Sequence, residues 1–305
     1  MLEFYQNLPQ HIDPIVFSIG SFSIRWYSVM WIAGMSVIYL ILYLAIKNNK
    51  FSIFNFSAKG GPASGWQFSN NFKLSNDQLQ NLFFWLVAGA LIGGRLGYVI
   101  FYNFSYYIHN PLEVFLPIQV MSYGLQVTGI FGMSYFGGLV GAIVAGYIFA
   151  RRKNLSFLGL ADFVILAVPA GYFFGRIGNF LNGELYGRST GVPWGMYFSD
   201  GGNVLRHPSQ LYEAFFEGIV LFLILRVAKN KKYGQRSKVS GQLFMIYVFG
   251  YAFFRFFLEF FRQPDFQEGL FFGWMTTGQL LAMMTVLITG LFFILRRLKI
   301  SIISI

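Results

Sequence analysis

The chain has 305 residues, 55% of them hydrophobic and only 11% charged, and its mean hydropathy is +0.54. Soluble domains carry about 25% charged residues, so this composition predicts an integral membrane protein. Cysteine is absent, which excludes disulfides, thiolate metal sites and a cysteine nucleophile in the protein itself. The 3 histidines are far apart in sequence and form no helical metal motif, so we expect chemistry without a metal or another cofactor.

Apolar segments of roughly the 20 residues needed to cross a bilayer recur along the chain. They predict an all-α membrane protein with about seven transmembrane helices in one membrane domain, residues 1–305. The predicted spans are about 25–46, 82–103, 133–150, 158–181, 211–228, 241–261 and 277–296.

Two longer connections separate these spans. Residues 47–81 are rich in Gly, Ser and Asn without an apolar period, which predicts a flexible cytoplasmic loop. Residues 182–210 are predicted to form a short extracytoplasmic segment. The N-terminus lacks the basic region, short apolar core and cleavage site of a signal peptide, so we expect the first span to be retained.

Lysine and arginine gather after the first, third, fifth and seventh predicted spans. Basic residues accumulate in cytoplasmic loops, so this alternation predicts an external N-terminus and a cytoplasmic C-terminus. Because these segments hold most of the basic residues, the formal charge of +11 does not indicate a nucleic-acid partner.

The basic residues outside these segments are all arginine. They are Arg25, Arg95, Arg176, Arg188, Arg206, Arg255 and Arg262. Counting along the predicted helices places Arg25, Arg95, Arg176 and Arg255 in the outer half of the membrane. A planar guanidinium matches phosphate bidentately, so the set predicts a bound anionic phospholipid. The alternative is that each arginine extends singly to the outer interface.

The sequence GRIGNFLNGELYGR, residues 175–188, follows an apolar run and holds several polar side chains. Ionisable groups inside hydrocarbon cost about 2.5 to 3.5 kcal/mol or more, which indicates a functional site. Arg176 and Asn179 fall on one helical face with Asn182 beside them, and both asparagines can donate to phosphate or glyceryl oxygens. Gly175 and Gly178 leave room for a second backbone or a lipid headgroup.

A second charged pattern lies in YAFFRFFLEFFRQPD, where Arg255, Glu259 and Arg262 stand at i, i+4 and i+7. This spacing predicts one helical face with the Glu259 carboxylate between the two guanidiniums. The alternative is a structural salt bridge between helices.

Small residues recur at helical spacing in two other spans, which predicts close helix packing. They are Gly89, Gly93, Gly97, Gly137, Gly138 and Gly141.

Several sequence motifs, taken in chain order, carry a resemblance to a known family. They are IDPIVFSIG, RWYSVMW, GALIGGRLGYVIFYN, GMSYFGGLVGAI, GRIGNFLNGELYGR, RHPSQLYEA and YAFFRFFLEFFRQPD. With them the chain resembles the prolipoprotein diacylglyceryl transferase family nearly end to end, and GRIGNFLNGELYGR matches the family signature. The resemblance implies a multi-pass protein of the bacterial inner membrane that moves a diacylglyceryl group from phosphatidylglycerol to the lipobox cysteine of lipoprotein precursors. A thioether forms and glycerol phosphate is released.

The resemblance and the arginine pattern together assign site residues. The expected catalytic residues are Arg176, Asn179, Glu184, Arg255, Glu259 and Tyr27. The residues expected to bind phosphatidylglycerol are Arg176, Arg255, Arg95, Asn182, Gly187 and His207. The expected partners are phosphatidylglycerol, prolipoprotein lipobox segments and membrane lipids.

One position departs from the family pattern. Members typically carry a histidine, and some a tyrosine, before the double glycine, but here the residue is Phe136. That histidine is a candidate base, and phenylalanine cannot replace it. The cationic site, Tyr135, Tyr27 or His207 are possible substitutes, since some thiolate forms without a dedicated base when cations are near. The alternative is a phosphatidylglycerol-binding homologue with weak or no activity.

A transporter for an anionic solute is a further alternative, in which arginines line a pathway. It predicts charged groups distributed from one membrane face to the other. Here the predicted arginines cluster in the outer half.

Overall fold

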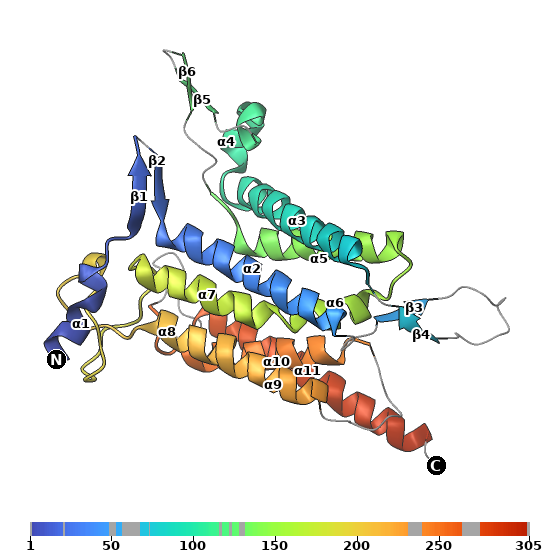
Figure 1. Cartoon of the computed structure of the whole chain (residues 1–305). Coiled ribbons are helices and arrows are strands. Elements are labelled where there is room, and N and C mark those ends of the chain that lie inside the picture. Colours follow the sequence, from blue (N-terminus) through green and yellow to red (C-terminus); the bar gives the residue numbers. More distant parts are fainter. Residues whose placement is uncertain are drawn as a thin grey trace. The chain divides into compact units, whose positions relative to one another are not determined.

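Most of the described residues are helical in the computed structural model (Figure 1). The structure describes residues 2–20, 22–48, 53–56, 68–72, 74–115, 118–121, 124–127, 132–230, 240–263 and 275–303. The chain divides into two compact units, one formed by Met1–Leu44 with Asp162–Ile305 and the other by Ala45–Ala161.

The first unit holds the chain's N-terminal and C-terminal helices. In chain order its elements are α1 (Leu2–His11), β1 (Ile15–Ile19), β2 (Phe22–Arg25), α2 (Trp26–Lys47), α6 (Phe157–Ile165), α7 (Val168–Leu181), the 3-10 turn η2 (Ser199–Gly201), α8 (Ser209–Glu213), the π-helical η3 (Ala214–Val220), α9 (Leu221–Asn230), α10 (Gln242–Leu258) and α11 (Thr277–Ile303). Helices α2 and α6 cross the boundary between the units.

The second unit is built around two long helices. Its elements are β3 (Ile53–Phe56), β4 (Phe68–Phe72), α3 (Asn76–Tyr102), α4 (Phe104–His109), the 3-10 turn η1 (Pro111–Val114), β5 (Ile118–Met121), β6 (Gly124–Val127) and α5 (Tyr135–Arg152).

Every apolar segment predicted as a span contains helix. Among the described residues, 3 helices are long and apolar enough to cross a bilayer: Trp26–Lys47, Asn76–Tyr102 and Thr277–Leu295. Helices α6 and α7 meet the same criterion together, with a bend of 48° between them. Pro169 near the start of α7 explains the break, because proline cannot donate to the preceding turn. These features are those of a helical membrane protein.

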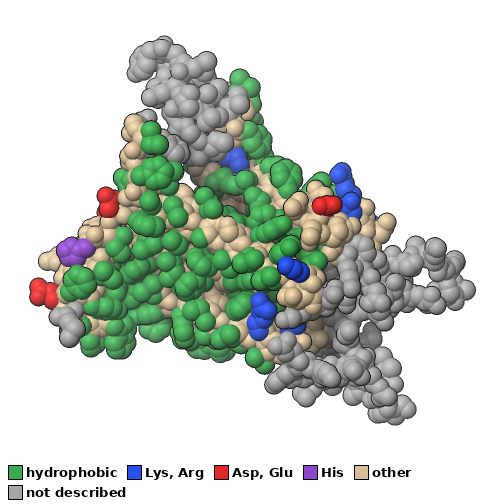
Figure 2. All heavy atoms as spheres, in the orientation of Figure 1, with side chains coloured by type: hydrophobic (Ala, Val, Ile, Leu, Met, Phe, Trp, Pro, Cys, Tyr) green, Lys and Arg blue, Asp and Glu red, His purple; other side chains and the backbone are tan. Residues whose placement is uncertain are grey.

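The helices expose large apolar side chains, whose contact with water would be unfavourable. Figure 2 shows hydrophobic side chains covering much of α2 and α9 on the viewed face. Ile32 of α2 is 69% exposed, and Leu223 of α9 is 56% exposed. Large apolar surfaces of this kind indicate contact with lipid or protein.

Strands are the main addition to the all-α expectation. The described residues form two-stranded antiparallel hairpins, β1 with β2, β3 with β4 and β5 with β6. The segment 47–81, expected as a flexible cytoplasmic loop, contains β3, β4 and the start of α3, while residues 49–52, 57–67 and 73 lie outside the described part. Ser75 and Gln78 form a capping box that starts α3.

Glycines bring α3 and α5 into close contact in the second unit. A Cβ on Gly93 would lie 2.4 Å from the carbonyl oxygen of Gly137, and a Cβ on Gly141 would lie 2.1 Å from that of Gly89. Side chains larger than hydrogen cannot fit at this distance. The predicted packing role of these small residues is confirmed.

A buried carboxylate fixes the start of α10 in the first unit. Asp162 Oδ2 accepts from the backbone nitrogen of Gly241 at 2.7 Å, and Oδ1 accepts from that of Phe244 at 2.8 Å. Gly241 has no side chain to cap the helix, so Asp162 of α6 supplies the missing acceptor. This contact sets the position of the helix that carries Arg255.

Candidate active site

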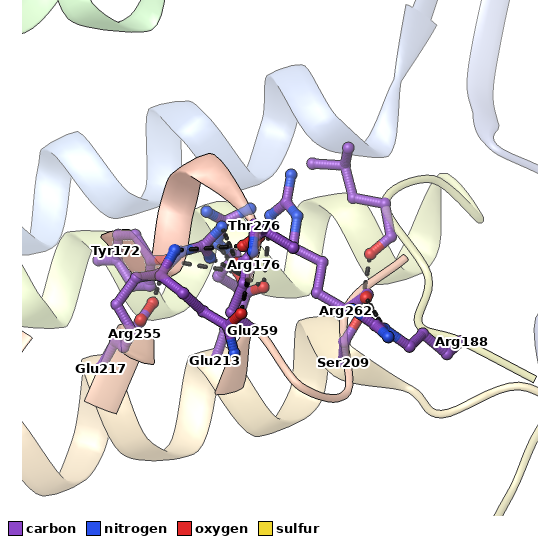
Figure 3. Close-up of polar contacts among 12 residues, drawn as sticks. Tyr172, Arg176, Arg188, Ser209, Glu213, Glu217, Arg255, Glu259, Arg262 and Thr276 are labelled. Carbon is purple, nitrogen blue, oxygen red and sulfur yellow. Dashed lines mark hydrogen bonds and ion pairs between the residues drawn. The ribbon is translucent and has the colours of Figure 1, made fainter. Parts of the chain in front are cut away.

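Glu213 of α8 is the centre of a polar cluster inside the first unit (Figure 3). Its Oε2 lies 2.8 Å from Nε of Arg176 on α7. Its Oε1 lies 3.2 Å from Nη1 of Arg255 on α10 and 3.4 Å from Nη1 of Arg262. Glu213 is 1% exposed, so its charge would be unfavourable without these partners. One carboxylate therefore holds three guanidiniums together.

Glu259 pairs with only one of the two arginines near it in sequence. Its Oε2 lies 2.8 Å from Nη2 of Arg255, at the predicted i, i+4 spacing. Arg262 pairs with Glu213 instead, so the prediction that Glu259 lies between both guanidiniums is wrong for Arg262. The reason is that α10 ends at Leu258, and the i+7 position no longer continues the helical face.

The start of α11 contacts the Glu259 carboxylate. Thr276 donates from Oγ1 to Glu259 Oε1 at 3.2 Å. A Cβ on Gly278 would lie 2.9 Å from the same oxygen, so glycine there leaves room for the carboxylate. The N-terminus of a helix carries a partial positive charge, which favours an acidic group nearby. Glu259 is thus held by Arg255 and by α11.

The signature residue Asn179 links Arg176 to Glu184. Asn179 Oδ1 accepts from Nη1 of Arg176 at 3.2 Å, and its Nδ2 donates to Glu184 Oε1 at 3.0 Å. Gln210 donates from Nε2 to the backbone carbonyl of Glu184 at 2.7 Å. Because both ends of the Asn179 amide contact protein groups, this residue orients Arg176.

Tyr27 and Asn182 meet where α2 begins and α7 ends. The backbone nitrogen of Tyr27 donates to Asn182 Oδ1 at 3.2 Å, and the Tyr27 hydroxyl accepts from Nε1 of Trp31 at 3.0 Å. A Cβ on Gly178 would lie 3.2 Å from Cα of Tyr27, so Gly178 admits a neighbouring backbone as predicted. At Gly175 the same position is open, with no atom of the described residues within 4 Å.

Backbone hydrogen bonds join the end of the signature to two segments beside the cluster, the one before α8 and the one after α10. The backbone nitrogen of Gly187 donates to the carbonyl of His207 at 2.8 Å, and that of Arg188 donates to the carbonyl of Phe261 at 2.9 Å. A Cβ on Gly187 would lie 2.4 Å from the Phe261 carbonyl oxygen, so the site requires glycine. Gly187 therefore allows the chain before α8 and the end of α10 to come together.

His207 lies among aromatic rings at this junction. Its Nδ1 is 3.2 Å from the Tyr212 hydroxyl, and its ring makes edge-to-face contacts with Tyr212 and Phe261. Burial lowers the pKa of the His207 imidazole from its ordinary value of 6.5, which favours the neutral ring at pH 7.

Arg95 belongs to the second unit, and its side chain contacts protein acceptors. Nη2 donates to the Glu113 carbonyl at 2.7 Å and to the Tyr107 hydroxyl at 3.1 Å. Nε donates to the Val114 carbonyl, and Nη1 to the Gly132 carbonyl at 3.3 Å. Arg95 is 4% exposed and holds η1 to the residues before α5. Its assignment to the donor lipid stays a prediction.

Two other positions from the sequence analysis are exposed. Arg25 ends β2 and forms no ion pair with any residue in the described ranges. Phe136, near the start of α5, is 62% exposed, and its ring stands edge-to-face against Tyr135 with 5.6 Å between centroids. Of the four arginines predicted to converge, Arg176 and Arg255 are joined through one carboxylate.

Three residues of the cluster were not selected from the sequence. They are Glu213, Glu217 and Tyr172. The Tyr172 hydroxyl lies 3.4 Å from Glu213 Oε2 and donates to Glu217, which is 1% exposed. A signal was present, because both glutamates interrupt the apolar segment 211–228, and buried acids in a span indicate function as arginines do. A search limited to basic residues passes over them.

The cluster includes three guanidiniums and three carboxyl groups, of which Glu217 contacts the Tyr172 hydroxyl. Arg176, Arg255 and Arg262 face two ion-paired carboxylates, those of Glu213 and Glu259. Across the described ranges Nη2 of Arg176 has no hydrogen-bond partner, although its other nitrogens do. In the same part of the chain, no group of three or more His, Cys, Asp or Glu side chains could hold a metal ion.

The fold and the cluster define a class: a helical membrane protein with a buried cluster of arginines and carboxyl groups. The profile of the prolipoprotein diacylglyceryl transferase family matches residues 14–295. The chain belongs to this family, as its sequence motifs predicted.

Relatives named phosphatidylglycerol–prolipoprotein diacylglyceryl transferase align along nearly the whole chain. The one from Chlorobaculum tepidum is 41% identical over 92% of this chain and 89% of its own length. The one from Aliivibrio salmonicida is 45% identical over 93% and 87%, respectively. The one from Aliarcobacter butzleri is 40% identical over 97% and 98%.

Proposed function

We propose that this protein transfers a diacylglyceryl group from phosphatidylglycerol to the lipobox cysteine thiol of prolipoproteins. The sulfur–carbon bond forms at the glyceryl carbon, and the carbon–oxygen bond to phosphate breaks with its electron pair moving to the leaving glycerol phosphate. The thiol proton is lost to the surroundings. Membership of the family and the names of its relatives support this reaction. The observation that carries it is the set of three guanidiniums held by Glu213.

The arginine cluster is suited to the charge that develops on the leaving phosphate. Preorganised donors aimed at developing charge stabilise a transition state most effectively where water is excluded. We assign the donor phosphate to Arg176, because Nη2 of this residue lacks a hydrogen-bond partner in the described structure. Nη1 and Nη2 of Arg255 face Glu213 and Glu259, so Arg255 contributes its charge while those carboxylates fix its position.

The remaining assigned residues are proposed to shape the site around Arg176. Asn179 and Glu184 orient its guanidinium, and Asn182 and Tyr27 line the outer end of α7. Gly187 and His207 support the donor lipid from the junction before α8. For Arg95 we propose an indirect contribution, through the position of the residues that lead into α5.

We also propose the predicted topology of about seven spans in the bacterial inner membrane, with an external N-terminus and a cytoplasmic C-terminus. The basic segments after alternate helices support this arrangement. The chain has no cysteine, so single-cysteine variants can be labelled cleanly. An impermeant thiol reagent should reach Asn203→Cys and Lys231→Cys from opposite membrane sides. Labelling of both from one side would exclude the proposed topology.

A second candidate is a phosphatidylglycerol-binding homologue with weak or no transfer activity. The observation that favours it is Phe136, which replaces the usual histidine and is exposed near the start of α5. An anionic-solute transporter is less well supported, because Arg176, Arg255 and Arg262 gather around one carboxylate.

One experiment separates these functions. Purified protein is incubated with phosphatidylglycerol and a lipobox peptide, and the peptide is analysed by mass spectrometry. Transfer adds a diacylglyceryl mass to the cysteine and produces glycerol phosphate. A peptide with serine in place of cysteine and the Arg176→Ala variant serve as controls. Lipid binding without any modified peptide would support the inactive homologue and overturn the proposed reaction.

A further inference from the structure

Tyr172 contacts Arg176 with both its hydroxyl and its ring. The two residues are one helical turn apart on α7. Nε of Arg176 donates to the Tyr172 hydroxyl at 2.8 Å, and Cζ of Arg176 lies 4.8 Å from the centroid of the Tyr172 ring. The hydroxyl fixes the Nε edge of the guanidinium, while the ring face attracts its positive charge. Tyr172 precedes GRIGNFLNGELYGR and belongs to none of the motifs that suggested the site.

The Tyr172 hydroxyl, which accepts a hydrogen bond from Arg176, also donates one to Glu217. The hydroxyl donates to Glu217 Oε2, and Glu217 is 1% exposed (Figure 3). Across the described ranges, no lysine or arginine lies within ion-pair distance of Glu217. This carboxyl group therefore differs from Glu213, whose oxygens contact arginines. Its observed polar contact is with tyrosine.

The main chain brings these two side chains together. Glu217 lies in the π-helical segment η3, and such segments often occur at functional sites. The next residue, Gly218, faces the residue after Tyr172: a Cβ on Gly218 would lie 2.8 Å from Cβ of Phe173. Close approach of the two helices at Gly218 thus places Glu217 against Tyr172.

The arrangement selects one orientation of the Arg176 guanidinium. A hydroxyl that donates to Glu217 directs its lone pairs toward other donors, and Nε of Arg176 is at 2.8 Å. Without Glu217, the hydroxyl proton could turn to Glu213 Oε2, which is 3.4 Å away. Nε is held by Tyr172 and Glu213, and Nη1 by Asn179, so among the described residues only Nη2 lacks a hydrogen-bond partner.

We propose that Tyr172 and Glu217 are a positioning pair that holds Arg176 with Nη2 available to the phosphate of the donor lipid. This inference rests on the proposed function. The pair acts through Arg176 and contacts neither the thiol nor the bond that breaks. Its effect therefore falls on the lipid substrate and leaves recognition of the peptide unchanged.

The test compares steady-state kinetics for the two substrates. Tyr172→Phe keeps the ring but removes the hydroxyl, and we expect kcat/KM for phosphatidylglycerol to fall about tenfold, as for loss of a hydrogen bond to a charged group. The KM for the lipobox peptide should not change. Tyr43→Phe on α2 is the matched control, because Tyr43 has no hydrogen bond to the cluster in the described structure.

Glu217 variants separate positioning from folding. Glu217→Gln keeps a carbonyl oxygen that can accept from Tyr172, so it should retain most activity, whereas Glu217→Leu should resemble Tyr172→Phe. The double variant Tyr172→Phe/Glu217→Leu should be no worse than the poorer single variant, because both changes remove one coupled interaction. Thermal unfolding in detergent identifies variants that fail to fold.

The outcomes distinguish the inference from the reaction on which it rests. An active wild type with Tyr172→Phe and Glu217→Leu kinetics equal to wild type would overturn the positioning role and leave the proposed function standing. Equal losses for both substrates in Glu217→Gln and Glu217→Leu would show a structural role and overturn the inference too. A wild type that forms no diacylglyceryl peptide would overturn both.

Discussion

The Glu213 carboxylate lies 2.8 Å from Nε of Arg176, and the two side chains are 1% and 16% exposed. Glu213 also contacts Arg255 and Arg262, so one substitution at this position changes the surroundings of three guanidiniums. The charges are removed from water, and removing one member of such a pair leaves the others uncompensated.

Glu213→Gln should therefore destabilise the fold strongly. Breaking a buried ion pair costs about 3 to 5 kcal/mol, which we expect to appear in the free energy of unfolding. The measurement is denaturation in detergent, with Glu3→Gln as the control because Glu3 is exposed on α1. Equal stability of the two variants would contradict a central role for Glu213.

Replacing Arg176 or Arg255 by lysine tests the need for a guanidinium. Lysine keeps the charge but loses the planar fork of donors. Turnover of phosphatidylglycerol should fall tenfold or more, equivalent to about 1.4 kcal/mol or more. Arg25→Lys should remain active, because Arg25 is exposed and outside the described cluster. Full activity in both cluster variants would refute the argument from the fork.

Phe136→His tests whether the histidine that the family resemblance suggests at this position is required. If the arginines supply most of the stabilisation of thiolate and leaving phosphate, wild type should already turn over and the histidine should add little. An obligatory base would instead raise the rate about 10²- to 10⁴-fold. Turnover of both proteins on one lipobox peptide is measured from pH 6 to 9. An inactive wild type beside an active Phe136→His variant would favour the obligatory base.

The lowered pKa of His207 predicts a pH effect on stability. A histidine with a depressed pKa binds fewer protons in the folded state than in the unfolded state. Its contribution to stability is therefore fully present above the ordinary pKa of 6.5 and is lost as pH falls below it. Thermal unfolding at pH 5 to 8 should show a smaller loss at low pH in His207→Gln than in wild type. If the stability of wild type and of His207→Gln fell in parallel between pH 8 and 5, burial of a neutral His207 ring would be contradicted.

The close glycine contact between α3 and α5 predicts that alanine destabilises the protein at Gly93. At Gly290, which lies on α11, the same substitution should not be destabilising. Gly93→Ala places a Cβ 2.4 Å from the Gly137 carbonyl oxygen and should lower the melting temperature. Gly290→Ala on α11 meets no atom within 4 Å in the described part of the chain, and alanine favours helix, so stability should be equal or higher. Similar melting temperatures for the two variants would argue against the close approach.

Hydropathy predicted where helices occur because lipid-facing helices need long apolar runs. It did not predict the break before Val168 or the π-helical Ala214–Val220, since these depend on local backbone contacts that leave little trace in composition. The short strands, such as Ile53–Phe56, were missed because an isolated hairpin needs only a few residues and a turn. Helix positions were thus more predictable than helix irregularities.

The basic half of the candidate site was predictable, and most of its acidic half was not. Arg176 and Arg255 are conspicuous as arginines in apolar runs, and Glu259 follows from its spacing to Arg255. Glu213 shares its segment with apolar residues and has no arginine three or four residues away. Its partners come from other helices, and such long-range contacts cannot be derived from one-dimensional periodicity.

The order of residues along the chain has a consequence for biosynthesis. Arg176 is made before Glu213, while Arg255 and Arg262 are made after it. A growing chain that has exposed α7 to lipid but has not yet made α8 carries a guanidinium without its carboxylate, at a cost of about 2.5 to 3.5 kcal/mol. We expect α7 to leave the insertion machinery together with α8, so that the later arginines enter a bilayer in which their acidic partner is already present.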